Sequence, residues 1–419
     1  MTGTLTQTVA DVAIGRLKLN EKPVPTAPSE AKLVDPFNYV GETFGKVDDS
    51  YPYADLLPHN PTRTHSEPPL TVQEITDRGF FADPGHARLR AWVKARGGTI
   101  KDLGICMGAV IEGENIKMEE LGDDEKDDLA LLIAERGVVF FRKQHSLTID
   151  QQREIGRHFG PLHKHPTYAV PRRGDLDDVV VVYSDKNSRP DLYAFSRAEL
   201  FHSDVTYELQ PPGATILRLY TTPEVGNDTL WSSGYNVYSQ LSRPYQLYLE
   251  SLSAIHTGHN QAASRSAAGH KIPLREPIDT IHPVVRVHPV TGLKAVFVNP
   301  GFVTRIVGVP KAESDNTLAF LKDCFAQQTD ATIRWRWEAG DVACWDNRVV
   351  NHSATFDAYP SQRHGLRVTP HAEVPLSVAD YEAKFGKPAK DWLKERFAKL
   401  NIDGPAQDDG KMKNGGFRD

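Results

Sequence analysis

A histidine and an aspartate stand two residues apart in the run LFHSDVTY at 200–207. On a β-strand, side chains two positions apart point to the same face, so His202 and Asp204 would present an imidazole and a carboxylate side by side. Such a pair is two-thirds of the facial triad that holds non-haem Fe(II), in which a distant histidine is the third ligand. A chain with 16 histidines can contain this spacing by chance, so a strand-end histidine beside a solvated aspartate is the alternative.

A second stretch with candidate polar groups is AGDVACWDNRVVNH at 339–352. Its Gly-Asp turn predicts the start of a buried strand that ends near His352. Arg363 and Arg367 follow His352 by 11 and 15 residues. A returning strand could bring such a guanidinium close to a metal site, where its planar fork can bind a carboxylate through two hydrogen bonds. From the spacing alone, one histidine and two arginines are more often ordinary surface charges.

Composition excludes several classes of function. With a formal net charge of −6, the chain has no reason to bind nucleic acid or an anionic membrane. No apolar run reaches the length of a transmembrane helix, and residues 1–17 lack the pattern of a secretory signal. Three widely spaced cysteines cannot build a disulfide framework or a zinc knuckle. These features predict a cytoplasmic protein.

The chain divides into three parts by composition. Residues 1–85 are rich in proline and predict an extended or partly disordered arm, with a first helical turn at 71–78. Residues 86–400 predict a single domain, and residues 401–419 a flexible tail. After Pro161, short apolar runs separated by Gly and Pro favour a sandwich or barrel over a parallel sheet. Strands are expected at 108–111, 137–142, 179–183, 215–220, 284–288, 295–299 and 333–337, and helices at 84–96, 123–135, 148–159, 235–240, 244–251, 312–328 and 377–400, the last one broken near 386–388.

Several ordered motifs together resemble one enzyme family. They are HSDVT at 202–206, GNDTLW at 226–231, WDNR at 345–348, and His352 with the two arginines that follow it. On these residues the sequence resembles the TauD/TfdA family of Fe(II)- and 2-oxoglutarate-dependent dioxygenases, over roughly residues 104–375. Within the family it is similar to taurine dioxygenase and to fungal sulfonate dioxygenases.

The resemblance implies a mainly β fold with flanking helices around a double-stranded β-helix, or jelly roll. It implies that His202, Asp204 and His352 hold Fe(II), and that 2-oxoglutarate and O2 are cosubstrates. The distal carboxylate of 2-oxoglutarate would be bound by Arg363 and Thr229. The expected reaction is oxidation of an unactivated C–H bond in a small, sulfonate-like anion, with release of succinate and CO2.

The resemblance also suggests how the substrate is bound. The anionic end of the substrate would be bound by His165, Tyr168 and Arg367. The pocket around the rest of the substrate would be lined by Val205, Tyr207 and Phe302. For His165 the alternatives are a loop histidine or, with His163, a second metal site. For the aromatic residues the alternative is plain core packing.

Two departures from the taurine enzyme bear on the substrate. Ala198 occupies the position of an asparagine that contacts the substrate there, and residues 256–259 lack its Ser-Phe contacts. We therefore expect taurine to be a poor substrate, although Arg367 still favours a small anion.

Three further expectations complete the interpretation. The same chemistry could act on a carboxylate such as an amino acid, including desaturation or ring closure. The non-enzymatic alternative is a jelly roll that binds a ligand without turnover. By resemblance, the chain is expected to form a homo-oligomer, a dimer or a tetramer.

Overall fold

The computed structural model describes residues 50–186, 196, 198–267 and 272–401. All of them belong to one compact unit, Val34–Asp419. Residues 1–49 of the predicted arm and 402–419 of the predicted tail lie outside the described residues.

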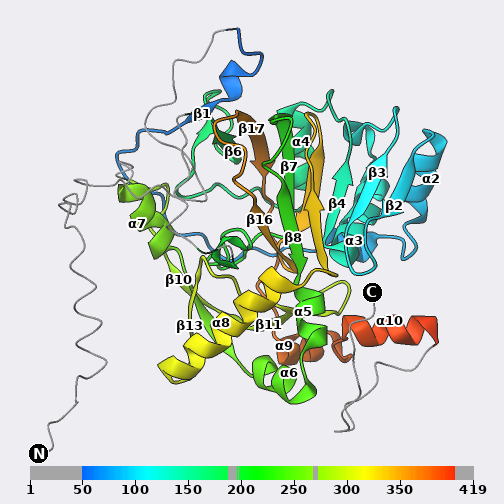
Figure 1. Cartoon of the computed structure of the whole chain (residues 1–419), viewed down its shortest axis with the longest axis vertical. Coiled ribbons are helices and arrows are strands. Elements are labelled where there is room, and N and C mark those ends of the chain that lie inside the picture. The colour runs from blue at the N-terminus through cyan, green and yellow to red at the C-terminus, as the bar shows by residue number, and fades with distance from the viewer. Residues whose placement is uncertain (1–49, 187–195, 197, 268–271, 402–419) are drawn as a thin grey trace, which may run out of the picture. The chain divides into compact units, whose positions relative to one another are not determined.

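The largest sheet has seven strands (Figure 1). All neighbours in it pair antiparallel except β3 and β4, which are parallel. In spatial order its strands are β2 (Thr99–Asp102), β3 (Ala109–Glu112), β4 (Val138–Phe141), β15 (Val342–Asp346), β7 (Ala214–Thr221), β17 (Arg363–Val368) and β6 (Val179–Ser184).

A second, three-stranded antiparallel sheet shares an apolar core with the first. Its strands are β14 (Thr332–Trp335), β8 (Thr229–Ser233) and β16 (Val350–Ala354). In this core Phe140 of β4 stacks on Trp335 of β14, with 3.8 Å between ring centroids, and meets Trp231 of β8 at 5.2 Å. The two sheets are thereby joined by buried aromatic side chains.

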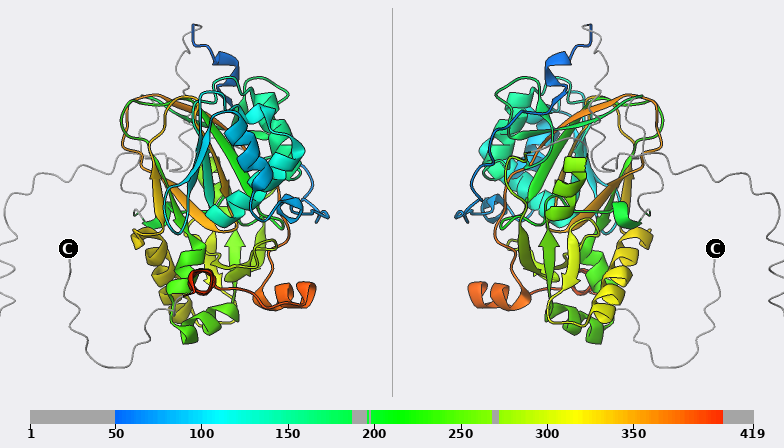
Figure 2. Two further views of the ribbon diagram at one scale, coloured as in Figure 1. Left: turned by 90° about the vertical axis from the view of Figure 1, so that its right-hand side faces the viewer. Right: turned by 90° about the vertical axis from the view of Figure 1, so that its left-hand side faces the viewer.

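Helices cover the other face of the large sheet (Figure 2). Successive side chains of a strand point to opposite faces. Val139 and Phe141 accordingly pack with these helices, whereas Val138 and Phe140 face the second sheet. This explains why β4 is apolar at every position. The covering helices are α2 (Ala87–Ala95), α3 (Asp123–Arg136) and α4 (Ile149–Phe159). Thr148 caps α4 in a capping box with Gln151, as its position in the sequence predicts.

The remaining elements surround these two sheets. Three short sheets are formed by β9 (Ser253–Thr257) with β10 (Asp279–Pro283) and β13 (Val303–Ile306), by β11 (Val285–Val287) with β12 (Lys294–Val296), and by β1 (Pro58–His59) with β5 (Val170–Pro171). The other helices are α5 (Gly234–Gln240), α6 (Arg243–Glu250), α7 (His259–Ala267), α8 (Lys311–Gln327), α9 (Val378–Phe385) and α10 (Trp392–Leu400), with single turns η1 (Ala54–Leu56), η2 (Arg78–Phe81), η3 (Met118–Glu120) and η4 (Ala198–Leu200). None of the helices in the described part of the chain has the length and apolarity that crossing a bilayer requires.

Residues 50–85, the described part of the predicted arm, lie against the body. Strand β1 pairs with β5, and the hydroxyl of Tyr51 is 2.8 Å from both Thr221 Oγ1 and His364 Nδ1. The helical turn expected at 71–78 is wrong, because the turn begins at Arg78 and runs to Phe81.

The single strand expected to run from Val342 to near His352 is also wrong. β15 ends at Asp346 and β16 begins at Val350, and the two strands belong to different sheets. A tight turn between them moves the chain from one sheet to the other, which places His352 in the smaller sheet.

Candidate functional site

Two of the candidate metal ligands are brought together by a backbone bridge. His202 N donates to His352 O at 2.9 Å, and His352 N donates to His202 O at 2.7 Å. Their ring centroids lie 4.3 Å apart. With Asp204, they offer ligand atoms that all lie within 4.8 Å of one another, the one such group of His, Cys, Asp or Glu found in the described residues.

The aspartate reaches this group by a route that the sequence did not predict. Only His202 takes part in a β-bridge; Asp204 begins a turn, and Val205 after it has a φ of 39°. The two-residue period of a strand is therefore not what aligns the carboxylate with the imidazoles. The conformation of the loop at 203–206 does so instead.

The protonation of the three side chains suits a metal ion. His202 Nδ1 is 2.9 Å from Leu200 O, which can only accept, so Nδ1 carries the proton and Nε2 is left with its lone pair. The Nε2 atoms of His202 and His352 are each 3.9 Å from Asp204 Oδ1. Burial lowers the pKa of both imidazoles, which keeps them neutral. Asp204 Oδ2 is buried and has no hydrogen-bond partner among the described residues. Two neutral imidazoles and a carboxylate are the ligands that non-haem iron takes.

Arg367 touches this group directly. It lies on β17, and its Nη1 donates to Asp204 Oδ1 at 2.6 Å. Its guanidinium carbon is 5.9 Å from the centre of the Tyr168 ring, and Tyr168 stacks on His165 with 3.8 Å between ring centroids. The structure thus brings together the three side chains that were predicted to bind the anionic end of a substrate.

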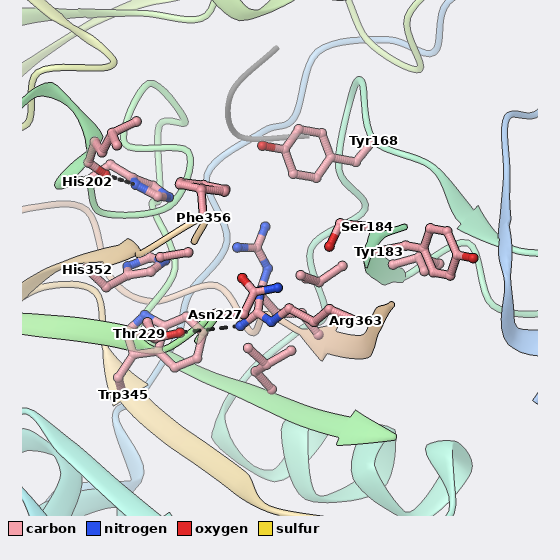
Figure 3. Close-up of a pocket in the computed structure, with 16 residues that line it drawn as sticks. Tyr168, Tyr183, Ser184, His202, Asn227, Thr229, Trp345, His352, Phe356 and Arg363 are labelled. Carbon is pink, nitrogen blue, oxygen red and sulfur yellow. Dashed lines mark hydrogen bonds between the residues drawn. The ribbon is translucent and has the colours of Figure 1, made fainter. Parts of the chain in front are cut away.

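Arg363 and Thr229 form a second polar group beside the first (Figure 3). Arg363 Nη2 donates to Thr229 Oγ1 at 3.3 Å, and Trp337 Nε1 donates to the same oxygen at 3.0 Å. Because the hydroxyl oxygen already accepts twice, its own hydrogen is left to donate to a ligand. Burial lowers the pKa of Arg363 to about 10, so that the guanidinium stays charged at neutral pH. No carboxylate of the described residues forms an ion pair with it. This group can receive an anion.

A pocket connects the two groups. Its empty space is about 840 Å³, part of it open to solvent. His202, His352, Thr229, Arg363, Arg367 and Tyr168 all line it. Figure 3 shows Phe356 beside His202, and Asn227 between Thr229 and Arg363.

Several wall residues were missed by sequence reasoning. Asn227 lies two residues before Thr229 inside the GNDTLW motif, which is the signal that could have identified it. No such signal marks the other missed wall residues. Phe356 follows β16, Leu200 precedes His202, and Val181 and Tyr183 lie on β6.

Four of the predicted substrate residues are not on this wall. One of them, His165, instead stacks on the wall residue Tyr168. Val205, Tyr207 and Phe302 form a buried cluster of their own, in which the rings of Tyr207 and Phe302 meet edge to face at 5.1 Å. Tyr207 also donates to Gln261 Oε1 at 2.8 Å. Their placement corrects the expectation that they line the pocket, and it agrees with the core-packing alternative.

The second-metal alternative for His163 and His165 finds no support in the described residues. His163 Nε2 is 2.9 Å from Glu208 Oε1, and Arg275 Nη2 is 3.0 Å from the same oxygen. This imidazole belongs to a buried ion-pair cluster, and His165 stacks on Tyr168.

Comparisons with known proteins agree on one family. The family model described as "Taurine catabolism dioxygenase TauD, TfdA family" matches residues 99–369. A putative alpha-ketoglutarate-dependent sulfonate dioxygenase of Schizosaccharomyces pombe is 38% identical over 80% of this chain and 83% of its own. The alpha-ketoglutarate-dependent sulfonate dioxygenase of Saccharomyces cerevisiae is 37% identical over 77% of this chain and 79% of its own. A crystal structure of a putative alpha-ketoglutarate-dependent taurine dioxygenase from Burkholderia xenovorans is similar with a TM-score of 0.56 and 30% identity, covering 68% of this chain and 96% of that one.

Proposed function

The chain belongs to the taurine catabolism dioxygenase TauD, TfdA family and is a 2-oxoglutarate-dependent dioxygenase, and we propose that His202, Asp204 and His352 hold its Fe(II). The observation that carries this assignment is the meeting of two neutral imidazoles and a buried, partly unpartnered carboxylate within 4.8 Å. When bound together, Fe(II), 2-oxoglutarate and O2 supply the oxidation of a C–H bond, with succinate and CO2 as coproducts. The residues of the chain bind, orient and shield these participants.

Arg363 and Thr229 are proposed to bind the distal carboxylate of 2-oxoglutarate. The support is a buried guanidinium that no described carboxylate neutralises, next to a hydroxyl whose hydrogen is free to donate. A guanidinium and a hydroxyl together satisfy the oxygens of one carboxylate, and burial strengthens these charge-assisted hydrogen bonds. Both side chains line the same pocket as the candidate metal ligands.

The substrate is proposed to be a small sulfonate-like anion. Arg367 would bind its charged end together with Tyr168, whose ring centre lies 5.9 Å from the guanidinium carbon, and His165, which stacks on Tyr168. The relatives named for sulfonates support this class, as does the Pseudomonas putida relative named for sulfate esters, which is 32% identical over 65% of this chain and 89% of its own.

The remainder of the substrate is proposed to be uncharged. No aspartate or glutamate is among the described residues that line the pocket, whereas Val181, Leu200 and Phe356 present apolar surface there. An ammonium group would enter such a pocket without a counter-charge, at a cost in desolvation. This supports the expectation that taurine is a poor substrate. It favours sulfonates or sulfate esters with an apolar chain.

A screen of succinate formation tests this proposal. The purified enzyme with Fe(II), ascorbate and 2-oxoglutarate is offered alkanesulfonates, alkyl sulfate esters, amino acids and aryloxyacetates in parallel. We expect turnover to be stimulated by the first two groups. Stimulation by amino acids alone would refute the sulfonate assignment and leave the dioxygenase assignment intact.

Four further features of the protein are proposed together with its function. The seven-stranded and three-stranded sheets are proposed to form a double-stranded β-helix, supported by their mainly antiparallel pairing and shared aromatic core. We also propose a cytoplasmic location and a homodimer or homotetramer. Finally, we propose from the composition of the chain that residues 86–400 form a single dioxygenase domain, against which residues 50–85 lie.

A further inference from the structure

The loop at 203–206, which carries Asp204, has a strained backbone. Val205 has a φ of 39°, in the left-handed region that a β-branched residue rarely adopts. Such a conformation persists only where the surrounding structure holds it. The loop lies outside the named strands, so its backbone groups cannot all be satisfied by a sheet ladder.

One buried amide holds the backbone of Asp204 itself. Asn347, which is 1% exposed, accepts from Asp204 N and from Trp345 Nε1 through its Oδ1, both at 3.1 Å. Its Nδ2 donates to Gly213 O at 3.2 Å and to Thr215 Oγ1 at 2.6 Å. Both amide hydrogens and the oxygen are therefore engaged. These four partners leave the side chain a single orientation, in which the oxygen points to Asp204.

Two further buried asparagines hold the residues on either side of Asp204. Asn299 Nδ2 donates to Ser203 O at 3.2 Å and to Thr206 Oγ1 at 3.0 Å. Asn351 Oδ1 accepts from Ser203 Oγ at 2.7 Å. The three amides come from the segment after β12, the turn between β15 and β16, and β16 itself. The loop is thus tied to separate segments of the chain.

We propose that Asn347 is a positioning residue that aims the carboxylate of Asp204 at the metal, and that Asn299 and Asn351 hold the flanks of the same loop. We call the three side chains the asparagine clamp. This inference rests on the proposed metal site, because Asp204 has to be a ligand for its aim to matter. Two imidazoles and one carboxylate complete a facial triad, so none of the three asparagines is needed as a ligand. The clamp fixes the backbone of Asp204, while Arg367 holds Oδ1, the carboxylate oxygen that lies 3.9 Å from both histidine Nε2 atoms.

The variant Asn347→Leu tests the clamp, because leucine is close to asparagine in size but can make none of its hydrogen bonds. Mn(II) binding to the purified protein is measured by calorimetry, without turnover. The charge-transfer band of the Fe(II) and 2-oxoglutarate complex is recorded in the absence of oxygen. Loss of a group that orients a metal ligand typically weakens metal binding by about 10- to 100-fold. We expect that range for Asn347→Leu, with a shifted or weakened band. Asn347→Asp keeps acceptor oxygens for Asp204 N and Trp345 Nε1 but loses both donors and buries a charge facing Gly213 O, so it should recover only part of the metal affinity.

Gln144→Leu is the matched control. Gln144 is 1% exposed, and its Nε2 donates to Ile116 O at 2.9 Å and Arg142 O at 2.7 Å, neither of which belongs to the loop or to its hydrogen-bond partners. This substitution should lower the unfolding temperature and leave metal affinity unchanged. If Asn347→Leu does not fold, Asn299→Ala, which releases Ser203 O and Thr206 Oγ1, should weaken Mn(II) binding about 10-fold.

The outcomes separate the clamp from the metal site. Equal Mn(II) affinity in the wild type and in a folded Asn347→Leu, or an equal loss in Gln144→Leu, would overturn the clamp and leave the triad standing. Failure of the wild-type protein to bind Mn(II) would instead overturn the proposed metal site.

Discussion

Replacing Arg363 with alanine should weaken 2-oxoglutarate binding far more than substrate binding. The side chain lies on β17, is 6% exposed and contacts Thr229 Oγ1. With a pKa lowered by burial only to about 10, it remains a cation at neutral pH. Because the described part of the protein supplies no carboxylate that forms an ion pair with this cation, the carboxylate of bound 2-oxoglutarate would neutralise it.

The size of the effect follows from the burial of the pair. Truncating one partner of a buried, charge-assisted pair costs about 2–5 kcal/mol, part of which is the other charge left unpaired. Because 1.4 kcal/mol is tenfold in affinity, the dissociation constant for 2-oxoglutarate should rise by about 30- to 4,000-fold. Thr229→Val removes one hydrogen bond of about 1 kcal/mol, so the constant should rise only by about fivefold.

An anaerobic titration measures both variants. 2-Oxoglutarate is added to the Fe(II)-loaded protein, and the visible charge-transfer band gives the dissociation constant without turnover. Arg367→Ala is the control and should keep 2-oxoglutarate binding. If Arg363→Ala binds 2-oxoglutarate normally while Arg367→Ala does not, the two arginines have been assigned in the wrong order. Arg348 offers no third candidate, because it is paired with Asp77, Asp346 and Glu373.

Four other results are expected. Alanine at any one of the three proposed metal ligands should abolish both turnover and the rise in unfolding temperature that Mn(II) produces; near-normal turnover in one of them would remove it from the triad. Arg367→Ala should abolish substrate-stimulated turnover but spare slow uncoupled consumption of 2-oxoglutarate, and Arg367→Lys should restore little because a point charge cannot replace a planar fork; full activity in the lysine variant would contradict this. Taurine should give a lower kcat/KM than an alkanesulfonate of similar length, and the reverse order would show that another group supplies the missing counter-charge. Burial lowers the pKa of His282, His364 and His371 to about 4, so between pH 6.5 and 4 the unfolded chain binds more protons than the folded one. The free energy of unfolding should therefore fall as pH falls, by up to about 1.4 kcal/mol per pH unit for each histidine. Equal stability at pH 7 and pH 5 in denaturant titrations would contradict these shifts.

The sequence alone determined the features that depend on local pattern. The start of α4 follows from Thr148, whose side chain satisfies the end of the helix beginning next to it. The strand β4 follows from four apolar residues between a glycine and an arginine. The order and spacing of the motifs carried the family and the candidate ligands, which the comparisons and the metal-ligand geometry support.

The tertiary structure alone decided which side chains meet. Asp204 turns toward the two histidines because a strained loop, held by amides from distant segments, directs it there. Val205 and Tyr207 lie one and three residues after Asp204 in the sequence, yet both belong to a separate buried cluster. Phe356 joins the pocket wall with no sequence signal at all. Side-chain periodicity predicts direction only within a regular element, and in a loop the direction is set by hydrogen bonds to residues far away in the chain.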